Sequence, residues 1–262
     1  LSHRRPESEV TKMARTFDPI ELEVLWQSLI ATVNEQARAL QRAAFSPIVR
    51  EAGDLANAVF DKRGRMVAQA VTGTPGHINS LARAVGAILD DYPISSLKPG
   101  DIIVTNDPYK TAGQLLDVTV MCPVWKNNEI IAFFGSTIHH TDVGGYGIGA
   151  GARDVFEEGL WIPICRLMIG GERNHDVWKF ILSNVRQPDH MAGDLHAQMA
   201  SGEVGAQRLR ALCDRHGLDA CFPPAGAPHK RGAHVTARDG ARPAALPPPR
   251  TAPSSPRRAP PA

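Results

Sequence analysis

The sequence predicts an α+β fold with a mixed, largely antiparallel sheet and packed helices. Helical periodicities and strand-like apolar runs alternate along the chain, but without the regular strand, helix, strand rhythm of a parallel sheet. Two pairs of strand-like runs are joined by short turns, at residues 61–64 and 126–128, which favour antiparallel hairpins. The 262 residues are 43% hydrophobic, which is enough to bury a sizeable core.

The expected elements follow from local patterns. Apolar residues recur at helical spacing over residues 18–46, where Asp18 is a suitable N-cap and Pro19 occupies the first helical position. Residues 144–151 are rich in glycine and predict a mobile loop that closes over a site. Further helices are expected over residues 77–90, 178–185 and 194–213, and strands over 56–60, 65–70, 102–105, 118–124 and 129–136.

Both ends of the chain differ in composition from the middle. Residues 1–17 are expected to be a disordered or mis-assigned extension, because Met13 is a natural start directly before the first structured segment. From residue 222 onward the chain holds seven Lys or Arg, one acid and several proline runs, which cannot form helices or strand ladders. We therefore expect a catalytic region over residues 18–217 and a disordered low-complexity tail over 218–262, with a basic anchoring tail as the alternative.

Composition also narrows the functional class. A net charge of +2 gives no general reason to expect nucleic-acid binding, and no apolar run approaches the roughly 18 residues of a membrane span. The four cysteines show no C-x-x-C spacing, and the chain lacks the G-x-x-x-x-G-K-[ST] loop that binds ATP. These features predict a cytoplasmic protein that binds no nucleic acid, no membrane and no nucleotide of its own.

Two segments at predicted strand ends indicate a metal site. The first runs from Asn106 to Asp117, and the second, residues 138–145, contains two adjacent histidines, an aspartate and two glycines. Carboxylate oxygen and imidazole nitrogen together suit a divalent transition metal (Zn, Mn or Fe) better than Mg or Ca. The alternative is that both segments are simple turns, since their Asn, Asp, Pro and Gly residues are typical of turns.

Within these segments the residues have different expected roles. Asp117 opens an apolar strand, where a buried carboxylate needs a cation or hydrogen bonds, so we expect it to be a ligand. His139 and His140 point to opposite faces if their segment is extended; we assign His139 as a ligand and His140 as a catalytic proton-transfer or substrate group. Asp142 is expected near the His139 face, as a catalytic proton carrier, a ligand or a carboxylate that orients a histidine.

A charged pair in the last third of the chain has a simpler interpretation. His190 and Asp194 are four residues apart in a predicted helical region and could share one helix face. We interpret them as part of a solvated face.

The chain resembles, over residues 18–216, the N-terminal part of the hydantoinase B/oxoprolinase family, which includes N-methylhydantoinase B and the related subunit of acetone carboxylase. Family members are about twice this length, so the resemblance implies a chain truncated or frameshifted after about residue 217. The matching segments are DPIE at 18–21, REAGD at 50–54, AVFDKRG at 58–64, NDPY at 106–109, HHTDVGG at 139–145, FEEGL at 156–160, NVR at 184–186 and GDLHAQ at 193–198.

The resemblance changes the interpretation of two residues. Asp54, which by itself is equally well a helix cap or part of a surface ion pair, becomes an expected metal ligand. Relatives commonly carry a histidine three residues before the equivalent of Asp117, and this chain has Gln114 there. An amide oxygen binds transition metals far more weakly than an imidazole nitrogen. The expected metal ligands are therefore Asp54, Asp117, His139 and, weakly, Gln114.

The resemblance also implies an activity. The chain is expected to be the metal-dependent catalytic subunit of an ATP-dependent cyclic amidohydrolase that opens a lactam or hydantoin ring, in a hetero-oligomer whose hydantoinase A-like partner subunit binds the ATP. One alternative is a subunit of the acetone or acetophenone carboxylase type, acting on a small ketone. Another is a non-functional remnant or a structural partner.

The departure at Gln114 gives a first testable prediction. Gln114→His should raise metal affinity by roughly ten- to a hundredfold, because it adds an imidazole where relatives carry one. Titration of the wild type and the variant with a transition metal measures the change. Equal or weaker binding in the variant would place Gln114 outside the ligand set.

Overall fold

A computed structural model of the protein describes residues 18–71, 73–149 and 151–217. Both predicted terminal segments, 1–17 and 218–262, lie outside the described residues. The strands are β1 Leu55–Phe60, β2 Met66–Gln69, β3 Ile102–Thr105, β4 Asp117–Lys126, β5 Glu129–His139, β6 Cys165–Ile169 and β7 Glu172–Arg173. The helices are α1 Pro19–Ala43, α2 Pro47–Arg50, α3 Pro75–Asp91, the 3-10 turn η1 Ile94–Ser96, α4 Val155–Glu158, α5 His175–Ser183 and α6 Pro188–Arg215.

These elements confirm the predicted α+β class. Seven strands form one sheet in the order β2-β1-β5-β4-β3-β6-β7, and every pair in it is antiparallel. Helix α1 begins as predicted, with the Asp18 side chain accepting a hydrogen bond from the N–H of Ile20 at 2.7 Å and proline in the first turn. The turn between β4 and β5 places Asn127 and Asn128 at positive φ, which suits a tight hairpin.

Some boundaries differ from the sequence prediction. Helix α6 begins at Pro188, six residues earlier than expected, because proline at a first helical position starts a helix without losing a hydrogen bond. The short elements α2, α4, β6 and β7 were not predicted, because two to five residues are too few to show a periodic pattern.

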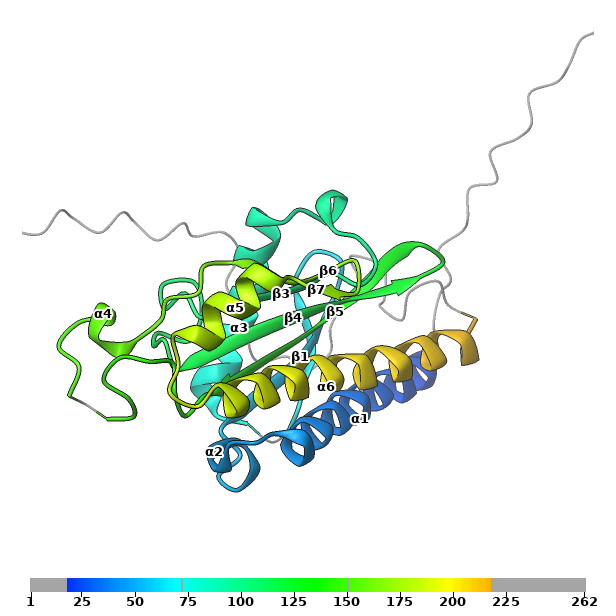
Figure 1. Ribbon diagram of the computed structural model, residues 1–262. Helices are drawn as coiled ribbons and strands as arrows, with labels where there is room; N and C mark the ends of the chain where they lie inside the picture. Colours follow the sequence, from blue (N-terminus) through cyan, green and yellow to red (C-terminus); the bar gives the residue numbers. More distant parts are fainter. Residues whose placement is uncertain (1–17, 72, 150, 218–262) are drawn as a thin grey trace, which may run out of the picture. The chain divides into compact units, whose positions relative to one another are not determined.

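The sheet has helices on both faces. Helices α1 and α6 run side by side along one face, and α5 packs on the same face near β6 (Figure 1). Helix α3 packs on the other face, against β1 and β5. Each strand near the centre therefore alternates between two buried environments, which explains why almost every residue of β1, β4 and β5 is buried.

The pairing of β4 with β5 sets the register of the whole sheet centre. Asp117 lies directly opposite His139, and the ladder continues to Lys126 opposite Glu129 with one irregularity near the hairpin turn. Strand β5 also carries Gly135 on the α3 face, where a Cβ would lie only 3.0 Å from the Phe60 ring and 3.1 Å from Leu81. The α3 helix can approach β5 this closely because that position has no side chain.

Helix α6 approaches the opposite face through glycines. A Cβ at Gly202 would lie 2.5 Å from Sγ of Cys122, and one at Gly205 would lie 2.8 Å from the ring of Phe134. These contacts are shorter than van der Waals distance, so neither position accepts a side chain without movement of the sheet or the helix.

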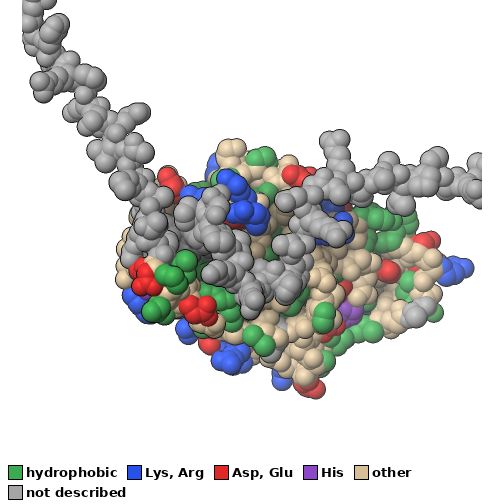
Figure 2. All heavy atoms as spheres, turned by 180° about the vertical axis from the view of Figure 1, so that it is seen from behind, with side chains coloured by type: hydrophobic (Ala, Val, Ile, Leu, Met, Phe, Trp, Pro, Cys, Tyr) green, Lys and Arg blue, Asp and Glu red, His purple; other side chains and the backbone are tan. Residues whose placement is uncertain are grey.

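The surface of the described part mixes charges of both signs. On the face visible in Figure 2, Lys and Arg are interspersed with Asp and Glu, and hydrophobic side chains reach the surface between them. Across the residues that the structure describes, no helix combines the length and apolar character needed to span a membrane.

The close packing of α6 generates a prediction about stability. Gly205→Ala should lower the free energy of unfolding by about 1–3 kcal/mol, because the new methyl group overpacks against Phe134. Gly86→Ala in α3 is the matched control, since its Cβ would meet nothing within 4 Å; it should raise stability by roughly 0.5–1 kcal/mol. Urea unfolding measures both, and a stabilised Gly205→Ala protein would contradict the packing described here.

Candidate functional site

Four ionisable side chains meet at one edge of the sheet, on the α3 face. Asp54 directly precedes β1, Asp117 begins β4, His139 ends β5, and His77 lies in the first turn of α3. Since β4 and β5 are paired antiparallel, the start of one strand lies beside the end of the other, which places Asp117 next to His139. The backbone N–H of His139 donates to the carbonyl of Asp54 at 3.3 Å and adds the third strand.

The four side chains form a continuous chain of contacts. Nδ1 of His139 lies 2.9 Å from Oδ1 of Asp117, at hydrogen-bonding distance. Nε2 of His77 lies 3.1 Å from Oδ2 of Asp117, and its Nδ1 lies 3.3 Å from Oδ1 of Asp54. His77 therefore bridges the two carboxylates.

Burial makes these contacts electrostatically strong. The Asp117 side chain is 1% exposed, and although burial alone would raise its pKa, the contacts with His139 and His77 lower the pKa of Asp117 to about 2. Burial alone would lower the pKa of His77, but Asp117 and Asp54 raise it above its ordinary value. The cluster thus holds an ionised carboxylate in a buried position through two imidazoles.

His140 occupies the other face of the sheet. It is 1% exposed, its backbone N–H donates to the carbonyl of Leu116 at 2.8 Å, and burial lowers its pKa despite the opposing influence of Asp194 and Gln198 on α6. The side chains of His139 and His140 therefore point to opposite faces of the sheet, as predicted. This arrangement separates His140 from the α3-face cluster by the thickness of the sheet.

Asp142 anchors a loop. Its carboxylate accepts hydrogen bonds from the N–H groups of Gly144 at 2.9 Å, Gln187 at 2.9 Å and Arg186, whose guanidinium also lies 3.1 Å away. The Arg186 side chain continues to the carbonyls of Gly144 and Gly145. These contacts join the base of the predicted glycine loop to the segment between α5 and α6, and they occupy both oxygens of the Asp142 carboxylate.

Gln114 is half-buried in the loop that leads into β4. Its carbonyl accepts the N–H of Asp117 at 3.3 Å, but within the described residues its side-chain amide makes no hydrogen bond to Asp54, Asp117 or His139. Of the predicted site residues, the structure therefore brings together Asp54, Asp117 and His139. Gln114, His140 and Asp142 make no side-chain hydrogen bond to these three among the described residues.

The interpretation of His190 and Asp194 needs correction. His190 is exposed, but Asp194 is only 1% exposed, and its Oδ1 accepts the N–H groups of Phe45 at 2.7 Å and Ser46 at 3.1 Å. Asp194 was expected on a solvated face; it instead fixes the corner between α1 and α2. The spacing of two residues along one helix does not show which other segment packs against that helix.

His77 is a residue of the cluster that the sequence did not predict. It stands in an ordinary amphipathic helix, and its role depends on contacts with residues 23 and 40 positions away, which local patterns do not report. One signal was available. His77 comes directly after the helix-opening Thr-Pro-Gly, and it is a polar residue in the first turn of a helix with an apolar face.

The side-chain types in the cluster are suitable ligands for a transition metal. Two carboxylates and two imidazoles are a typical set for such an ion, and ligands 2.0–2.2 Å from a metal lie roughly 3 Å from one another, close to the distances above. Asp117 Oδ2 is buried without an aligned hydrogen-bond donor, because His77 Nε2 is near it but not along a hydrogen-bond direction. In the geometry of the described residues the side chains pair with each other, and no three of them surround a common point.

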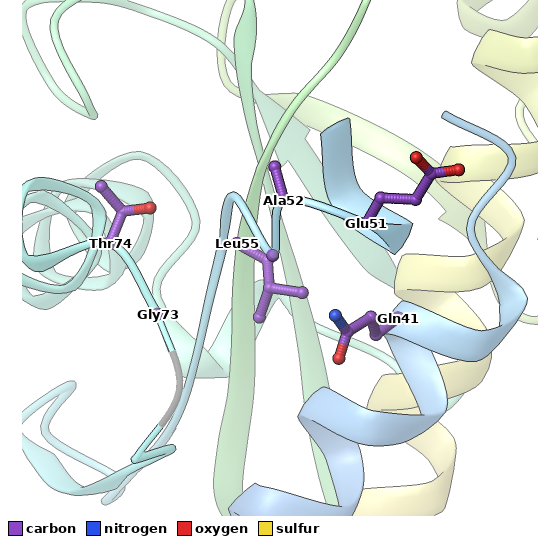
Figure 3. A pocket seen from close by; sticks show the side chains of 7 residues that line it. Gln41, Glu51, Ala52, Leu55, Gly73 and Thr74 are labelled. Carbon is purple, nitrogen blue, oxygen red and sulfur yellow. The ribbon is translucent and has the colours of Figure 1, made fainter. Parts of the chain in front are cut away.

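A pocket lies beside the cluster. Its volume is about 420 Å³, within the range of small-molecule sites, and its lining residues come from the end of α1, the turn before Asp54 and the segment before α3. Figure 3 shows the Gln41 amide directed toward Leu55, with Glu51 pointing away from both. Thr74 lines the pocket and donates its hydroxyl to Asp54 Oδ1 at 2.5 Å, so the pocket reaches to within one side chain of the cluster.

The loop anchor predicts a pH-dependent effect on stability. Although burial alone raises the pKa of Asp142, the N–H groups of Gly144, Gln187 and Arg186 and the Arg186 charge lower it below its ordinary 3.8. A depressed carboxyl pKa stabilises the folded state above the unfolded pKa, and the contribution is lost as pH falls through the folded pKa. Asp142→Asn should therefore cost about 1–3 kcal/mol at pH 7.

Urea unfolding between pH 7 and pH 3 measures this difference. The gap between wild type and Asp142→Asn should start to narrow below about pH 4. Asp90→Asn, on an exposed site, is the control and should change little at any pH. A gap that stays constant to pH 3 would show that the Asp142 charge does not matter.

The chain is similar in sequence to known proteins. The chain is 35% identical over 206 residues to an uncharacterized protein of Methanocaldococcus jannaschii, covering 77% of this chain and 36% of that protein. It is 32% identical over 207 residues to the caprolactamase subunit beta of Pseudomonas jessenii, covering 78% of this chain and 35% of the subunit. The chain thus spans little more than a third of these relatives' length.

Solved structures share the fold. The crystal structure of the ATP-dependent caprolactamase from Pseudomonas jessenii matches with a TM-score of 0.69 at 31% identity, over 78% of this chain and 36% of that one. A nucleotide-free acetone carboxylase structure also matches with a TM-score of 0.69, over 76% of this chain and 26% of that one, but at 20% identity this likeness concerns the fold alone. The family model for hydantoinase B/oxoprolinase matches residues 18–225. The chain therefore belongs to the hydantoinase B/oxoprolinase family.

Proposed function

We propose that this chain is the metal-dependent catalytic subunit of an ATP-dependent enzyme that opens small cyclic amides, such as lactams or hydantoins. The observation that carries the proposal is the buried contact of Asp117 with His139, with Asp54 and His77 beside it. Burying a carboxylate with two imidazoles is costly unless the group has a chemical role or binds a cation. The relationship to a caprolactamase subunit supports a cyclic amide as the substrate class.

Asp54, Asp117 and His139 would hold a divalent transition metal (Zn, Mn or Fe), with Gln114 at its edge. When bound, such an ion polarises a carbonyl or lowers the pKa of a water for attack at neutral pH. Asp117 contributes its negative charge and Oδ2, which lacks an aligned donor, and His139 contributes an imidazole already oriented by Asp117.

Proton transfer is better placed on His77 than on His140 or Asp142. His77 lies on the same face of the sheet as the cluster and contacts both carboxylates. His140 lies on the opposite face, and Asp142 binds Arg186 and backbone N–H groups. His77 can thus receive a proton from a group in the site and return it to a leaving amine. Asp142 and Arg186 would serve the site by holding the base of the glycine loop that closes over it.

ATP would be bound by a hydantoinase A-like partner subunit, in a hetero-oligomer. The sequence has no phosphate-binding loop of the P-loop type, and the caprolactamase relative is named as a subunit of an ATP-dependent enzyme. The partner would activate the amide carbonyl with ATP, and this chain would direct the attack of water. Such an assembly would work in the cytoplasm, where ATP is available.

A carboxylase of small ketones is the second candidate. The acetone carboxylase likeness favours it at the level of fold, and the same two carboxylates and imidazoles could orient a ketone enolate and carbon dioxide. A remnant without activity, or a structural partner, is the third. Incubation of the chain with an A-type subunit, ATP and either caprolactam or acetone distinguishes the candidates, because ring opening, carboxylation and the absence of both are separate results.

Metal content tests the site itself. Asp117→Asn and His139→Ala should each reduce the metal retained by the full 262-residue chain from about one ion to near none, because each removes a charged or nitrogen ligand. Asp90→Asn and His190→Ala, on exposed positions, are matched controls and should retain it. Elemental analysis after gel filtration decides, and unchanged metal in both site variants would refute the assignment.

A further inference from the structure

Thr74 joins two elements of the candidate site. It is the residue before α3, the helix that carries His77, and its hydroxyl donates to Oδ1 of Asp54 at 2.5 Å. Its backbone N–H also donates to the carbonyl of Leu55 at 3.2 Å. Thr74 therefore ties the start of α3 to the start of β1 through both its side chain and its backbone.

The direction of this side chain is unusual for its position. Threonine before a helix ordinarily accepts a hydrogen bond from an N–H of the first turn and so caps the helix. Thr74 occupies the N-cap position of α3 but makes no side-chain capping bond. Its hydroxyl is committed to Asp54, so α3 gives up a stabilising cap in favour of a contact at the site.

The contact restricts how the Asp54 carboxylate is presented. Oδ1 receives the Thr74 hydroxyl and faces Nδ1 of His77 at 3.3 Å. Oδ2 accepts no hydrogen bond from any described residue, and the side chain as a whole is 32% exposed. A partly exposed carboxylate rotates freely unless something holds it, and the hydroxyl bond supplies that restraint while leaving Oδ2 available.

We propose that Thr74 is a positioning residue that orients Asp54 so that Oδ2 remains available to the ion. This rests on the proposed metal site. Figure 3 shows Thr74 on the pocket wall opposite Gln41, so the same hydroxyl that holds Asp54 also lies where a substrate would approach. Thr74 acts through Asp54 and does not itself bind the ion.

Titration of the full chain with Mn²⁺, followed by the electron paramagnetic resonance signal of free Mn²⁺, tests the proposal. Thr74→Val keeps the shape but removes the donor and should weaken Mn²⁺ binding by roughly tenfold, the usual effect of losing a residue that orients a ligand. Thr74→Ser restores the hydroxyl and should bind as the wild type does. Should the valine variant unfold, Thr74→Ala makes the same comparison.

Two further variants separate positioning from general damage. Thr32→Val in α1 removes a threonine hydroxyl bonded at 2.8 Å to the Ser28 carbonyl of the same helix, and it should leave Mn²⁺ binding unchanged. In an Asp54→Asn background, Thr74→Val should have no further effect, because the group that it positions is already altered.

The outcomes distinguish this inference from the proposed function. A wild-type chain that binds no Mn²⁺ overturns the metal site and this inference with it. A wild-type chain that binds Mn²⁺, with Thr74→Val binding equally well or with additive losses in the double variant, overturns the positioning role alone.

Discussion

The antiparallel pairing of β4 with β5 is the constraint on which the site depends. It sets Asp117 directly opposite His139, so two residues 22 positions apart in sequence become cross-strand neighbours with side chains on one face. Every other contact is built on this pair: β1 pairs with β5 and brings Asp54, and α3 packs on the same face and brings His77. A change that shifts this ladder would separate all four side chains at once.

The sheet also divides the polar residues of this region between two environments. On the α3 face the carboxylates and imidazoles contact one another and adjoin a pocket. On the α6 face Gln198 donates to the carbonyls of Val118 and Ser136 at 3.0 and 3.3 Å, and Asp194 holds the corner after α1. The conspicuous motif around residues 193–198 is thus explained by packing: Gly193 admits the Phe45 ring, and the two polar residues fix neighbouring backbone.

The sequence was sufficient to predict the central part of this arrangement. The long helix, both hairpins and the opposite directions of His139 and His140 followed from local periodicity and turn chemistry, which act over a few residues. His77, the Thr74 contact and the burial of Asp194 could not be predicted in this way. Each depends on which distant segment packs against it, and helical or strand periodicity indicates only that a face is buried, not what covers it.

Strand β5 has an unusual sequence that gives Gly135 a role beyond close packing. Several adjacent residues in it are near-duplicates: Ile130 and Ile131, Phe133 and Phe134, Ser136 and Thr137, and at its end His139 is followed by His140. A slip of one residue would turn the strand over, yet at these pairs it would present a similar side chain to each face. Gly135 opposes such a slip, because a slipped strand would place a phenylalanine or serine against Phe60 and Leu81. The missing side chain at this position thereby favours the register in which His139 faces the site.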